Sequence, residues 1–76
     1  MVVTDREVLR AAARDVRTLM RRRQANESRA AGFWVPVDPV LMALAVECDS
    51  VIYGQRAETA DLGDRLAVVL GDGWEP

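Results

Sequence analysis

Apolar side chains recur at helical spacing in three segments of the chain. In the first segment, residues 5–24, they return every three or four positions and so fall on one side of a helix: Val8, Leu9, Ala12, Val16, Leu19 and Met20. Thr4 and Glu7 have the spacing of a capping box, which predicts the start of this helix. Polar residues at 26–28 interrupt the apolar side, and we therefore expect the helix to end near Gln24.

The second segment, residues 39–53, has the most clearly marked ends. Asp38 is a favourable N-cap, and Pro39 suits the first helical position because its missing N–H has no partner to lose there. Gly54 is a typical residue to end the helix. One side of the predicted helix is apolar: Leu41, Leu44, Ala45, Cys48, Val51 and Ile52.

The third segment, residues 58–70, repeats the pattern over a shorter length. Its apolar positions are Leu62, Leu66, Val69 and Leu70, and Gly71 follows them. Asp61 and Arg65 stand four positions apart in the acid-first order that stabilises a helix by a few tenths of a kcal/mol. We predict a single all-α domain over residues 1–76. A long N-terminal helix is followed by an aromatic connector and a helical hairpin.

Composition narrows the class of protein. The chain is half apolar and 29% charged, which is typical of a globular domain. Cys48 is the only cysteine and histidine is absent, so the usual zinc ligand sets are excluded. We predict no catalytic residue, no cofactor site and no metal site, and hence a protein that is not an enzyme. The lone cysteine and the absence of an export signal at the N-terminus favour the cytoplasm, and no apolar run is long enough for a membrane span.

All ten basic residues are arginine, and eight of them precede residue 38. That half of the chain has a net charge of about +4 and the remainder about −6. The absence of lysine and the abundance of alanine and valine indicate GC-rich codons, which favour a bacterial or phage origin. Codon bias does not explain the alignment of five arginines, here called the arginine row, within an arc of about 80° on the first helix: Arg6, Arg10, Arg14, Arg17 and Arg21.

The arginine row has three interpretations. It is a solvated polar side of the helix, a contact for an acidic protein surface in the same or another chain, or a binding surface for a nucleic-acid backbone. Phosphate binding is disfavoured because the chain is acidic overall and no aromatic residue is interleaved with the row. The candidate acidic partners stand in or near the third helix: Glu58, Asp61 and Asp64.

A second apolar stripe on the middle helix consists of Met42, Val46 and Tyr53, with Asp49 between them. A helix that is apolar on two sides is either central in its fold or shared with a partner. Three aromatic residues lie outside the helices and either close the core or anchor a partner: Phe33, Trp34 and Trp74.

These features favour a non-enzymatic protein–protein interaction module, as a self-associating subunit or an adaptor of a bacterial or phage assembly. The alternative is a small DNA- or RNA-binding regulator that uses the arginine row. Binding to a membrane is not expected.

Overall fold

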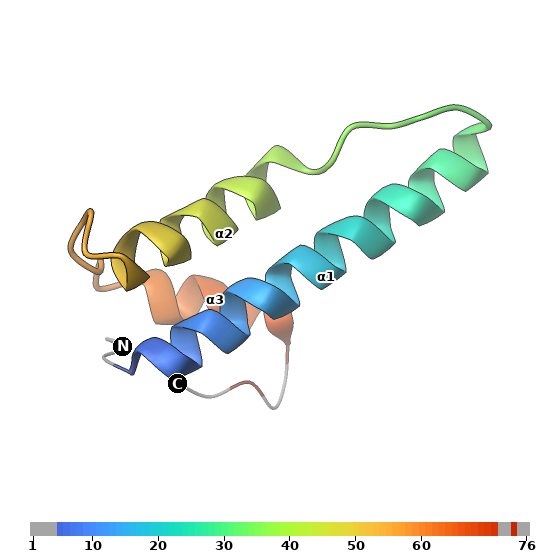
Figure 1. Cartoon of the computed structure of the whole chain (residues 1–76). Coiled ribbons are helices and arrows are strands. Elements are labelled where there is room, and N and C mark those ends of the chain that lie inside the picture. Colours follow the sequence, from blue (N-terminus) through green and yellow to red (C-terminus); the bar gives the residue numbers. More distant parts are fainter. Residues whose placement is uncertain (1–4, 72–73, 75–76) are drawn as a thin grey trace.

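The computed structural model describes residues 5–71 and residue 74, and the described residues form three helices without a strand. They are α1 (Arg6–Ala31), α2 (Pro39–Ile52) and α3 (Leu62–Leu70). α1 and α2 lie side by side in opposite directions, and α3 packs against α1 (Figure 1). The structure confirms the predicted all-α fold, with a long first helix followed by a pair of shorter ones.

α1 is longer than predicted, and its expected end near Gln24 was wrong. The polar residues after Gln24 change the character of the helix surface, but they do not stop the backbone hydrogen bonds. The helix ends only at Gly32, which adopts a left-handed conformation with φ 78° and donates its N–H to Ser28 O at 2.9 Å. At the other end, Asp5 is the N-cap and its carboxylate accepts from Glu7 N–H at 2.9 Å. Thr4 lies outside the described residues.

α2 begins as predicted, because the Asp38 carboxylate accepts from Val40 N–H at 2.8 Å and Pro39 occupies the first turn. It ends at Ile52, one residue before the predicted limit, and Gly54 follows in the left-handed region. α3 begins at Leu62, four residues later than predicted. The carbonyl of Ser50 accepts from two backbone N–H groups just after α2, and this holds the intervening segment as a loop.

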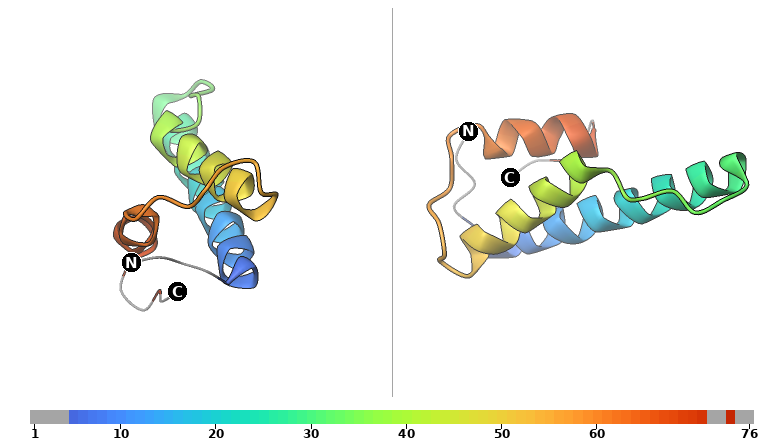
Figure 2. Two further views of the ribbon diagram at one scale, coloured as in Figure 1. Left: turned by 90° about the vertical axis from the view of Figure 1, so that its left-hand side faces the viewer. Right: turned by 90° about the horizontal axis from the view of Figure 1, so that it is seen from above.

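The core lies mainly between α1 and α2, and α3 closes it from one side (Figure 2). The helical spacing in the sequence predicted most of its members, which are buried: Leu9, Ala12, Ala13, Val16, Met20, Leu41, Leu44, Ala45, Cys48, Ile52, Leu62 and Leu66. None of the described helices combines the length and the apolarity that a bilayer crossing requires.

The last third of α1 extends past the other helices, and the connector returns beside it (Figures 1 and 2). No residue of α1 after Met20 is buried. The extension is instead braced through the connector, because Gln24 Nε2 donates to Val35 O at 3.0 Å and Ser28 Oγ accepts from Val35 N–H at 2.9 Å. These two bonds explain why the polar end of α1 remains helical.

Candidate functional site

The arginine row follows one flank of α1, beside α2. Ala13 and four members of the row, Arg10, Arg14, Arg17 and Arg21, line one wall of a shallow hollow of about 320 Å³. Its opposite wall comes from the end of α2, namely Asp49, Ile52 and Tyr53. Arg6 is exposed in the first turn of α1.

Asp49 is an acidic partner of the arginine row within the same chain. Its carboxylate accepts hydrogen bonds from both terminal nitrogens of Arg17, and both side chains are about one-third exposed. The hydrogen bond to Asp49 raises the pKa of Arg17. This bidentate pair ties α1 to α2 at the fourth of the five arginines of the row.

The other members of the row make weaker contacts among the described residues. Arg10 pairs with Glu7 at 2.9 Å and Arg14 Nε lies 3.6 Å from Asp15 Oδ1, but all four side chains are more than half exposed. Exposed pairs of this kind stabilise a protein by about 0–1 kcal/mol. Within the part of the chain that the structure describes, no carboxylate lies within ion-pair distance of Arg21. Most of the positive charge of the row therefore faces solvent.

The apolar stripe of α2 lies on the same flank as Asp49 and is exposed to solvent. Relative exposure is 39% for Met42, 51% for Val46 and 73% for Tyr53. Because Asp49 pairs with Arg17, the stripe and the arginine row border each other along the seam between α1 and α2. We call these two rows together the mixed face. The sequence predicted each row, but only the packing of α1 on α2 makes them neighbours.

The three aromatic residues outside the helices have different environments. Phe33 and Trp34 are about 70% exposed at the turn after α1. Trp74 is partly buried and packs against the core, as the core-closing interpretation predicts. The adjacent Phe33 and Trp34 are thus the aromatic pair that the fold leaves accessible.

The acidic candidates near α3 do not share one flank of a helix. Asp61 is the N-cap residue of α3, and its Oδ2 lies 3.1 Å from Arg65 Nε, which confirms the predicted pair. A hydrogen bond with Thr59 lowers the pKa of Asp61. Glu58 belongs to the loop before α3, and Asp64 lies in its first turn. Pairing of these three acids with the arginine row of another chain stays a prediction.

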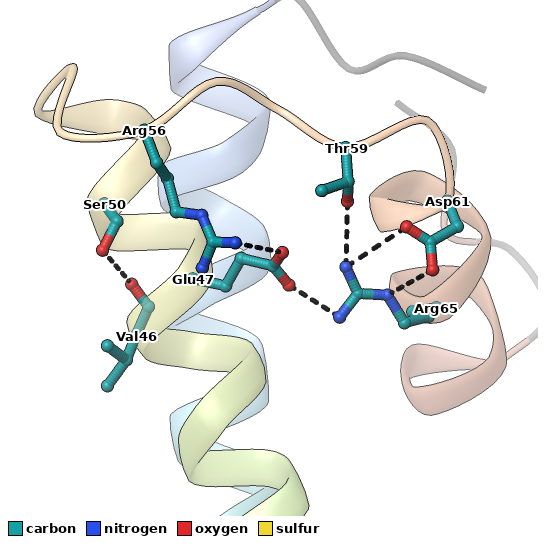
Figure 3. Close-up of polar contacts among 7 residues, drawn as sticks. All are labelled: Val46, Glu47, Ser50, Arg56, Thr59, Asp61 and Arg65. Carbon is teal, nitrogen blue, oxygen red and sulfur yellow. Dashed lines mark hydrogen bonds and ion pairs between the residues drawn. The ribbon is translucent and has the colours of Figure 1, made fainter.

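Glu47 is a buried charge that the sequence did not single out. It is only 8% exposed on α2, and its carboxylate lies 2.6 Å from Arg65 Nη1 and 3.9 Å from Arg56 Nη2 (Figure 3). The hydrogen bond from Arg65 to Glu47 raises the pKa of Arg65. The sequence did contain a signal for this contact. Glu47 is an acidic residue within a mostly apolar helix, and Arg65 follows in the next helix.

The Glu47–Arg65 pair lies beside an open groove between α2 and α3, here called the α2/α3 groove. The groove has a volume of about 720 Å³. Its walls are mostly apolar, and charged side chains complete the lining: Pro39, Val40, Ala43, Leu44, Glu47, Arg56, Asp64, Arg65, Val68 and Val69.

Cys48 is fully buried, and burial raises the pKa of its thiol to about 11. A thiol with this pKa is protonated at neutral pH and is a poor nucleophile. Among the residues that the structure describes, no three histidine, cysteine or acidic side chains are grouped to hold a metal ion.

Comparison with protein-family models, with curated proteins and with solved structures finds no match.

Proposed function

We propose that this chain is a non-enzymatic protein–protein interaction module, acting as an adaptor or a self-associating subunit. The observation that carries the proposal is the exposed apolar stripe of α2, which borders the arginine row on the mixed face. Large apolar and aromatic side chains next to arginine are typical of interface centres. A bacterial or phage assembly in the cytoplasm fits the arginine-rich, lysine-free composition and the single reduced cysteine.

The test is the mass of the native complex, measured from the source cells and compared between the wild type and two stripe variants. Met42→Asp and Tyr53→Asp introduce charges at exposed positions, so each should leave the fold intact and reduce the mass toward that of the monomer, 8.4 kDa. Ala67→Asp, at an exposed position on α3, is the matched control and should keep the complex. A monomeric wild type, or a complex that both stripe variants retain, would contradict the proposal.

The alternative, a nucleic-acid-binding regulator, is favoured by the solvent-facing arginines of the row. Asp49 argues against it, because this carboxylate neutralises Arg17 at the centre of the surface that phosphates would approach. If the four other arginines of the row contact duplex DNA, the logarithm of affinity should fall with the logarithm of salt with a slope of about −3.6. The absence of binding to duplex or single-stranded nucleic acid at low salt would exclude this function.

A further inference from the structure

We propose that the mixed face binds an acidic amphipathic helix of a partner protein. This inference rests on the proposed function and adds to it the chemistry of the partner. A helix bound in this way would lie along the seam between α1 and α2, with its apolar side on the stripe and its carboxylates on the arginine row.

The apolar stripe is as long as the part of the arginine row that follows Arg6. Arg10 and Arg21 are eleven positions apart on α1, and Met42 and Tyr53 are eleven positions apart, from the first turn of α2 to its C-cap. Each of these stretches covers about 16 Å, or three helical turns. α1 and α2 run antiparallel (Figure 1), and the two rows meet where Arg17 pairs with Asp49 and where Tyr53 faces the arginines across the shallow hollow. A ligand helix of three to four turns fits the surface.

The charge of the mixed face selects an acidic ligand. α1 carries eight arginines and three acids, and Asp49 neutralises one member of the row, Arg17. Arg21 has no carboxylate partner among the described residues, and the contacts of Arg10 and Arg14 are exposed. Carboxylates aligned along one flank of a ligand helix would complement these arginines, whereas a basic helix would be repelled.

A second copy of the chain is a poorer occupant of the same surface. A two-fold symmetric contact through the mixed face would place the arginine row of one copy opposite either the arginine row or the apolar stripe of the other. Neither offers it a row of carboxylates, because Asp49 is already paired with Arg17. A nucleic-acid backbone is poorer as well, because half of the mixed face is the apolar stripe, which offers phosphates no hydrogen-bond donor along its aliphatic part. A ligand helix can contact both the apolar stripe and the arginine row only if one of its sides is apolar and the adjoining side is acidic.

The inference is tested with a display library of 14-residue helical peptides selected on the whole chain. We expect the enriched peptides to carry apolar residues at positions i, i+4 and i+7 and at least two carboxylates on one adjoining flank. One enriched peptide is then titrated against Arg21→Glu and Arg22→Glu. These neighbouring substitutions change the charge equally, but Arg22 lies beside α3, on the other flank of α1.

Arg21→Glu should weaken peptide binding about fivefold or more, because a favourable exposed ion pair becomes a repulsion, and Arg22→Glu should change it less than about twofold. Equal losses for the two variants, enriched peptides without carboxylates, or no enrichment would overturn the inference. Tighter binding to anionic lipid vesicles or to a 20-base-pair DNA duplex at the same salt, lost in Arg21→Glu, would also overturn it. A native complex that requires Met42 and Tyr53 but is unaffected by Arg21→Glu would refute this inference while leaving the proposed function intact.

Discussion

Removal of the Arg65 side-chain charge should destabilise the fold through Glu47. Arg65→Met keeps the apolar stem of the side chain but takes away the guanidinium that lies 2.6 Å from the Glu47 carboxylate. Glu47 is only 10% exposed at its side chain, and among residues 5–71 the other cation near it is Arg56, at 3.9 Å. The substitution therefore leaves a nearly buried carboxylate without a close partner.

The expected loss of folding stability in Arg65→Met follows from how deeply the Glu47–Arg65 pair is buried. Removing one partner of a fully buried ion pair costs about 3–5 kcal/mol. Because the Arg65 side chain is 41% exposed, water replaces part of the interaction, and we expect a loss of about 2 kcal/mol. For a domain of this size, that is a large part of a total stability of about 4–11 kcal/mol.

The assay is urea unfolding followed by circular dichroism, with Arg56→Met as the matched control. Arg56 is 53% exposed and more distant from Glu47, so its loss should cost less than about 0.5 kcal/mol. The double variant Glu47→Met with Arg65→Met should recover most of the stability lost in Arg65→Met, because no buried charge is left. Equal losses for Arg65→Met and Arg56→Met, or a double variant less stable than Arg65→Met, would refute this account of Glu47.

Three further predictions concern the core, the connector and the thiol. Leu66→Ala should destabilise the domain by about 2–5 kcal/mol, whereas Val68→Ala, at an exposed position two residues away, should change stability by less than about 0.5 kcal/mol in thermal melts. Ser28→Ala should reduce the local stability of the connector by about 1 kcal/mol and should accelerate hydrogen exchange at the Val35 amide. An unchanged exchange rate would show that the hydrogen bond from Val35 to Ser28 does not stabilise the connector. Burial raises the pKa of the Cys48 thiol from 9.0 to about 11, so about 2–3 kcal/mol of stability that is present below pH 9 should be lost as the pH rises from 9 to 11. Urea unfolding across that range checks this, and Cys48→Ala should lack this part of the pH dependence.

The periodicity of the sequence predicted the buried side of every helix, because burial follows directly from the 3.6-residue repeat. Helix ends were predicted well where a cap residue determines them, as at Asp38 and Gly54. The end of α1 was missed because its last turns depend on contacts of Gln24 and Ser28 with the connector. Such contacts between distant positions leave no periodic signal in the sequence.

The candidate surfaces were predictable as separate rows but not as one face. Spacing placed the arginine row on one flank of α1 and the apolar stripe on one flank of α2. Which flank of α1 meets which flank of α2 depends on how the two helices pack, and sequence periodicity does not determine this. The sequence pattern placed Asp49 among the residues of the stripe, but it did not predict the ion pair with Arg17, which depends on how the helices pack.

The two acids of α2 explain how charge fixes the arrangement of the three helices. Glu47 and Asp49 are two positions apart, so on a helix their side chains point about 160° away from each other. One reaches Arg65 of α3 and the other reaches Arg17 of α1, on opposite flanks of an otherwise apolar helix. Each of these partly buried pairs favours one orientation of α2 about its axis, and a rotation of the helix would break both. Within the arginine row, Asp49 pairs only with Arg17. The other arginines of the row therefore remain directed outward, beside the exposed apolar stripe.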